Sequence, residues 1–142
     1  MRATFGWGCA VTSGFGFAIE AIGGVLHNGD FFLQFAHETM YSAFFVVGLI
    51  AILEARGSLP NDSWRLAIGF AFFVEGLVFY GHMLEQKGTE QMLHFVMVMF
   101  SWFTAACYLF SCLFKRHFLP HVLGASGMLI KGIWFFVIAN IL

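Results

Sequence analysis

Residues 92–114 read MLHFVMVMFSWFTAACYLFSCLF, and this stretch decides the fold class. It contains no Asp, Glu, Lys or Arg. A helix needs about 20 predominantly apolar residues to cross the ~30 Å hydrocarbon core of a bilayer, and this stretch is long enough. Its apolar residues are continuous, without the alternation and the ~10-residue rhythm of an outer-membrane barrel strand. The stretch therefore predicts a transmembrane α-helix.

The composition of the whole chain agrees with this prediction. Of its 142 residues, 60% are apolar and 11% are charged, and the mean hydropathy is +0.83. A soluble domain has about 25% charged residues, and a fold of this size cannot hide so much apolar surface from water. With a net charge of −1, the chain fits neither an ordinary soluble enzyme, nor a nucleic-acid binder, nor a disordered chain.

Four more runs are long enough to span a membrane, and turn-forming residues such as Asn28-Gly29, Pro60, Gly88 and Pro120 separate them. We predict an all-α, polytopic transmembrane bundle that forms a single domain over residues 1–142. The predicted spans are residues 5–26, 31–53, 64–83, 92–114 and 122–142.

Basic residues outside the spans predict the direction of insertion. Five spans put the N-terminus and the second and fourth loops on the same side of the membrane. That side holds Arg2, Arg56, Arg65, Lys115 and Arg116. The other side holds only Lys87, so the positive-inside rule predicts a cytosolic N-terminus.

Small residues recur every four positions in the first predicted span, at Gly6, Ala10, Gly14 and Ala18. This spacing places them on one helix face, where another helix can approach closely. The stripe predicts a helix-packing surface, either within the chain or toward another membrane subunit.

Ionisable residues inside the predicted spans are the candidates for function, because each costs about 2.5–3.5 kcal/mol to insert near the bilayer centre. They include Glu20, His37, Glu75, His82, His94 and Lys131. With the predicted topology the histidines lie toward the non-cytosolic face. We predict a polar pocket that opens there, with Glu20, Glu75 and Lys131 at its floor and the histidines around it.

Several chemistries fit this pocket. His37, Glu75, His82 and His94 are candidate ligands for zinc, copper or iron, and the thioether of Met40 would favour Cu(I). Two axial histidines would also suit a haem, and Glu20, Glu75 and Lys131 are candidates for a proton relay. Alternatively, the histidines are interfacial and a Glu pairs with Lys131 only to neutralise both charges.

Compact motifs do not narrow this choice. His37-Glu38 begins like a zincin motif, but position 41 is Tyr rather than the second His. Ser42, Ser101, Ser111 and Ser126 lie in no nucleophile elbow. A metal site would therefore rest on arrangement alone, and an enzyme is the less favoured reading.

Short motifs do resemble a known family. Residues 37–41 (HETMY) resemble an H-S/T-x-M-Y element, residues 73–82 (FVEGLVFYGH) an E-G-x-x-F-Y-x-H helix and residues 90–94 (EQMLH) a D-Q-x-x-H turn. Residues 132–135 (GIWF) resemble a G-x-W-F/W element and residues 16–20 (GFAIE), more weakly, a G-x-x-x-E segment. These are signatures of the transmembrane protein 45 family, a eukaryotic multi-pass group of unassigned function, and the resemblance covers roughly residues 14–142.

The resemblance implies a helical bundle, usually of seven spans, in endomembranes or the plasma membrane. It carries over His37, Met40, Glu75, His82 and His94 as signature positions, but it implies no reaction. The family's first and last spans have no counterpart here, so a short member or a piece of a longer chain is expected. Lys131 stands where an uncharged polar residue is expected, which indicates a local charge pair with a Glu.

Two functions stay open at this point. The first is a membrane protein that binds a transition metal or haem, or relays protons or ions, through the His/Glu pocket. The second is a structural or accessory subunit of a larger membrane complex, whose partners are lipid and other membrane subunits or further copies of the chain. Nucleic acid is not an expected partner.

Overall fold

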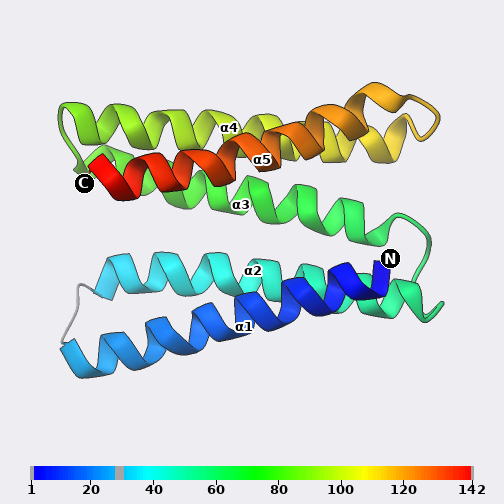
Figure 1. The fold of residues 1–142 in the computed structure, drawn as a ribbon, viewed down its shortest axis with the longest axis horizontal. Coiled ribbons are helices and arrows are strands. Elements are labelled where there is room, and N and C mark those ends of the chain that lie inside the picture. The colour runs from blue at the N-terminus through cyan, green and yellow to red at the C-terminus, as the bar shows by residue number, and fades with distance from the viewer. Residues whose placement is uncertain (1, 28–30, 142) are drawn as a thin grey trace. The chain divides into compact units, whose positions relative to one another are not determined.

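The computed structural model describes residues 2–27 and 31–141, which form five α-helices and no strand (Figure 1). The helices are α1 (Arg2–His27), α2 (Phe31–Ala55), α3 (Ser63–Glu85), α4 (Thr89–Leu113) and α5 (Phe118–Ile141). Each contains an apolar segment long enough to cross a membrane. The predicted class, an all-α multi-pass membrane protein, is confirmed.

Most helices extend beyond the predicted spans into segments that were predicted as loops. The clearest case is Pro120, which was predicted to break the chain but lies in the first turn of α5. A proline is compatible with that position because the first amide groups of a helix have no carbonyl partner to lose. Glu54 was likewise predicted in a loop and lies in the last turn of α2.

The chain reverses direction where the backbone enters the left-handed region. Gly57 has φ 78° between α2 and α3, and Gly88 has φ 63° immediately before α4. A side chain is strained in this conformation, whereas glycine adopts it freely. Asp62, the residue before α3, also has a positive φ of 76°.

The chain divides into two compact units, residues 1–71 and 72–142, and the boundary lies inside α3. In the first unit α1 lies along α2 (Figure 1). In the second unit the later part of α3 packs with α4 and α5.

Backbone contact between α1 and α2 holds the first unit together. A Cβ atom at Gly48 would lie only 2.6 Å from the amide nitrogen of Ala10 and 2.8 Å from the carbonyl oxygen of Gly6. The two helices therefore touch where neither carries a bulky side chain, as small residues allow in membranes. In the predicted stripe, Gly6 and Ala10 face α2 and Gly14 lies against Phe45, while Ala18 is exposed.

Glycines also permit close packing in the second unit. A Cβ atom at Gly76 would lie 2.3 Å from the indole ring of Trp102, which joins α3 to α4. A Cβ atom at Gly127 of α5 would lie 2.4 Å from Oγ1 of Thr104 on α4. These contacts bring the helices near enough for polar side chains on different helices to meet.

Candidate functional site

A buried ion pair forms the centre of the second unit. The Nζ atom of Lys131 on α5 donates a hydrogen bond to Oε2 of Glu75 on α3. Lys131 is 3% exposed and Glu75 is 4% exposed. Each charge alone would be costly inside a membrane, and pairing them removes the net charge of the site.

Aromatic rings surround the ammonium group of Lys131. Its Nζ lies 4.7 Å from the ring centroid of Phe72, 5.7 Å from that of Phe79 and 5.9 Å from that of Phe135. These distances fall within the ~6 Å range in which a ring face attracts a cation. The ammonium is therefore held by one carboxylate and several π faces.

The side chains of this site follow a helical spacing along α3. Phe72, Glu75, Phe79 and His82 are separated by three, four and three residues, so they lie on one face of the helix. Aromatic and ionisable residues alternate along this face. Phe79 lies between the two ionisable residues, and its ring also approaches Phe135 at 5.9 Å between centroids.

A pair of histidines lies next along the same face. The rings of His82 on α3 and His94 on α4 meet edge to face, with centroids 4.8 Å apart. The Nδ1 atom of His94 is 2.8 Å from the backbone carbonyl of Glu90. Because a carbonyl only accepts hydrogen bonds, Nδ1 carries a proton, and Nε2 is the accepting nitrogen of the neutral ring.

Phe79 connects the histidine pair with the ion pair. Its ring centroid lies 6.4 Å from that of His94, and the same ring faces Lys131. Phe79 is itself buried, at 8% exposure. A single aromatic side chain therefore separates the imidazole of His94 from the ammonium of Lys131.

Hydroxyl groups continue the polar character along the buried face of α4. Ser101, Thr104 and Ser111 are fully buried there. Ser101 donates to the carbonyl of Met97 and Ser111 to that of Tyr108. Within the described residues, Oγ1 of Thr104 has no hydrogen-bond partner. A buried hydroxyl without a partner is uncommon, because burial without a hydrogen bond is costly.

The first unit holds an ionisable pair of its own. The Nδ1 atom of His37 on α2 lies 2.5 Å from Oε1 of Glu20 on α1. The two side chains are 36% and 30% exposed. Met40, the predicted copper-favouring residue, is half-buried on α2. The structure thus gives His37 a carboxylate partner inside its own unit.

Glu54 is a buried ionisable residue that sequence reasoning missed. Its carboxylate accepts hydrogen bonds from Arg2 at 3.0 Å and from the backbone amides of Asp62 at 3.1 Å and Trp64 at 2.9 Å. It therefore satisfies orphan amide groups at the start of α3. Glu54 was predicted in the loop after the second span and was therefore not considered as a site residue. A charged residue at the end of an apolar run is nevertheless a signal for a side chain that binds the amides of the next helix.

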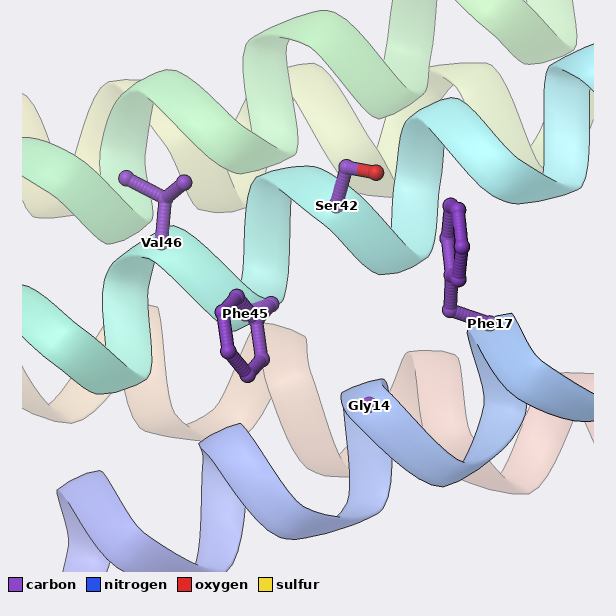
Figure 2. Close-up of a pocket in the computed structure, with 5 residues that line it drawn as sticks. All are labelled: Gly14, Phe17, Ser42, Phe45 and Val46. Atoms are coloured by element: carbon purple, nitrogen blue, oxygen red, sulfur yellow. The ribbon is translucent and has the colours of Figure 1, made fainter.

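The first unit also has an apolar groove of about 300 Å³ between α1 and α2. Figure 2 shows Gly14 and Phe17 on α1, opposite Ser42, Phe45 and Val46 on α2. Ser42 contributes the polar atom among these lining side chains. The lining of the groove is therefore mainly apolar.

The predicted site residues are thus divided between the two units. Glu75, Lys131, His82 and His94 belong to the second unit, and Glu20 and His37 pair in the first. Across residues 2–27 and 31–141, no three His, Cys, Asp or Glu side chains form a group that could hold a metal ion. Glu75, predicted at the floor of the pocket, is buried at 4% exposure.

Comparison with known proteins gives a family match. The model of a family of unknown function (DUF716) matches residues 61–142, which include all of α3, α4 and α5. No solved structure matches the chain. The matched region contains the ion pair, its aromatic neighbours and the histidine pair.

Proposed function

The chain belongs to the family of unknown function DUF716, and on that premise we propose that residues 72–142 form a proton-transfer element inside a membrane. The observation that carries this proposal is the buried pair of Glu75 and Lys131, which shares the ring of Phe79 with the histidine pair His82 and His94. Ionisable residues that pay the cost of burial in a bilayer commonly mark proton and ion pathways.

In this proposal the proton enters at the histidine pair. A proton taken up at Nε2 of His94 converts the neutral ring to imidazolium. Transfer to the carboxylate of Glu75, through water that bypasses the ring of Phe79, then restores the neutral imidazole and produces a carboxylic acid. The charged group in contact with Glu75 during this step is Lys131 from α5, whereas His94 from α4 contacts the ring of Phe79 and pairs with His82.

Protonation of Glu75 has a direct consequence for Lys131. The ammonium loses the negative charge that neutralises it and keeps only the aromatic faces. This unpaired positive charge favours release of the proton from Glu75. The buried hydroxyls on α4 can both accept and donate hydrogen bonds, as the next groups of a proton relay must. The positive-inside bias places the histidine end toward the non-cytosolic side.

The narrower family assignment is part of the same proposal. Residues 73–82, 90–94 and 132–135, which resemble transmembrane protein 45 signatures, all lie inside the matched region. We take the chain to be related to those proteins and, from that resemblance, propose an endomembrane or the plasma membrane as its location. Binding of a metal ion has less support, because the described residues contain no group of three ligating side chains.

A purely structural role for the ion pair is the competing proposal, and it corresponds to an accessory subunit. In that case Glu75 and Lys131 only neutralise each other so that α3 and α5 can pack in the membrane. The two proposals differ in what happens when both charges are removed together. A buried ion pair can often be replaced by neutral residues without loss of stability.

The test measures proton flux in liposomes that contain a trapped pH-sensitive dye, with a valinomycin-driven potassium potential as the driving force. We expect the wild-type chain to acidify or alkalinise the lumen faster than empty liposomes do. The proton flux of the Glu75→Gln/Lys131→Met double variant should be at least about tenfold lower than that of the wild type, as expected for removal of a proton-transfer group.

The matched control is Glu85→Gln, which alters an exposed carboxylate at the end of α3 and should keep the wild-type rate. Folding of each variant is checked by circular dichroism in the same lipid. A double variant that folds and conducts protons like the wild type would refute the relay and favour the structural role.

A further inference from the structure

The aromatic surroundings of Lys131 exceed what an ion pair requires. An ammonium group has three N–H donors, and within the described residues the hydrogen bond of its Nζ goes to Glu75. The rest of the group faces the rings of Phe72, Phe79 and Phe135 rather than hydroxyls or carbonyls. This combination is the one that proteins use to recognise ammonium ligands.

We propose that Phe72, Glu75, Phe79 and Phe135 form an ammonium cage, a binding site for small primary alkylammonium ions that Lys131 occupies as a tethered ligand. The inference goes beyond proton transfer, since it concerns which cation the cage recognises. It rests on the geometry around one nitrogen atom, in which a carboxylate and several aromatic faces converge.

The cage also predicts selectivity among amines. Glu75 accepts a hydrogen bond from the occupant, so the occupant needs at least one N–H donor. A quaternary ammonium has none and would leave the carboxylate without its hydrogen bond. A neutral alcohol of the same length can donate a hydrogen bond but gains no attraction from the ring faces. Primary alkylammonium ions satisfy both parts of the cage.

The walls of the cage differ in exposure. Phe72 and Phe79 are buried at 4% and 8% exposure, whereas Phe135 is 41% exposed. The cage is therefore least covered by the rest of the second unit on the side of Phe135, which belongs to α5 like Lys131 itself. In the wild-type chain the tethered ammonium competes for this place at a very high effective concentration.

The test uses the Lys131→Ala variant in detergent micelles or nanodiscs. This substitution removes Cγ, Cδ, Cε and Nζ, the atoms that n-propylammonium replaces. We expect n-propylammonium to raise the midpoint of thermal unfolding of the variant in a saturable manner. Tetramethylammonium and n-propanol at equal concentrations should leave it unchanged, and the wild type should show no response to the amine.

Two further variants identify the cage as the site. Adding Glu75→Gln to Lys131→Ala should abolish the response to n-propylammonium. Adding Phe72→Leu should weaken its apparent affinity by about 2- to 30-fold, the range expected for loss of one cation–π contact. If n-propylammonium and n-propanol shift the midpoint equally, or if the Glu75→Gln background still responds, the proposal is overturned.

The experiment remains decisive if Lys131→Ala does not fold by itself. The readout is then the yield of folded protein recovered in n-propylammonium compared with the yield in n-propanol. A higher yield in the amine supports the cage, and equal yields contradict it. Because no proton flux is measured, failure of the proton-transfer proposal and failure of the ammonium cage are distinguishable.

Discussion

Replacing Gly48 by Ala tests the backbone contact that joins α1 to α2. The new Cβ atom would lie 2.6 Å from the amide nitrogen of Ala10 and 2.9 Å from its Cα. To reach ordinary van der Waals distance the helices must separate by roughly 0.8 Å, a gap that forfeits a quarter to a half of each neighbouring dispersion contact. Both obstructing atoms are backbone, so no side-chain rotation relieves the clash.

The expected effect combines two opposing terms. Overpacking of this kind costs about 1–3 kcal/mol, and the better helix propensity of Ala returns about 0.5–1 kcal/mol. We expect the free energy of unfolding to fall by the difference, about 0–2.5 kcal/mol. The assay is equilibrium unfolding by SDS in mixed micelles, followed by circular dichroism.

Gly8→Ala is the matched control, because nothing lies within 4 Å of the Cβ position at Gly8 on α1. This variant gains helix propensity without a clash, so it should be as stable as the wild type or more stable. If Gly48→Ala unfolds at the same SDS fraction as Gly8→Ala, the close approach of α1 and α2 is not the packing that stabilises the first unit.

Three further variants test other parts of the structure. Glu54→Gln should lower the free energy of unfolding by about 1–3 kcal/mol, since charge-assisted hydrogen bonds to buried groups are lost, whereas Glu85→Gln should not change SDS unfolding. Gly76→Ala should displace the indole of Trp102 and shift the tryptophan emission spectrum, while Gly81→Ala, whose Cβ position is open, should leave it unchanged. A glycosylation acceptor placed in the α3–α4 loop should be modified in microsomes and one in the α2–α3 loop should not; the reverse result would overturn the predicted topology.

The number and type of the elements could be predicted because a bilayer leaves few alternatives to apolar helices. Their ends could not be predicted as well. Hydropathy reports composition, but a helix ends where its terminal amides and carbonyls find other partners. Glu54 is charged and still lies in α2, since its carboxylate binds Arg2 and the amides that begin α3. Pro120 interrupts the apolar pattern and still begins a helix.

The candidate site could be predicted in part. The cost of a charge in hydrocarbon indicated that Lys131 needs a carboxylate, but it did not distinguish Glu20 from Glu75 as that partner. The choice depends on how each helix is rotated, which hydropathy does not report. The spacing along α3 contains more information than was used, since Phe72 and Phe79 lie three and four residues from Glu75 on one face.

The separation of Glu75 and Lys131 along the chain has a consequence for biosynthesis. The two residues are 56 positions apart, and a ribosome that adds about 5–20 residues per second needs roughly 3–11 s to make the residues between them. During that interval α3 carries a carboxylate whose partner does not yet exist. We therefore expect the translocon to retain α3, or Glu75 to stay protonated, until α5 emerges. Ribosome-bound chains that end before Lys131 should remain cross-linkable to the translocon through α3, and longer chains should not.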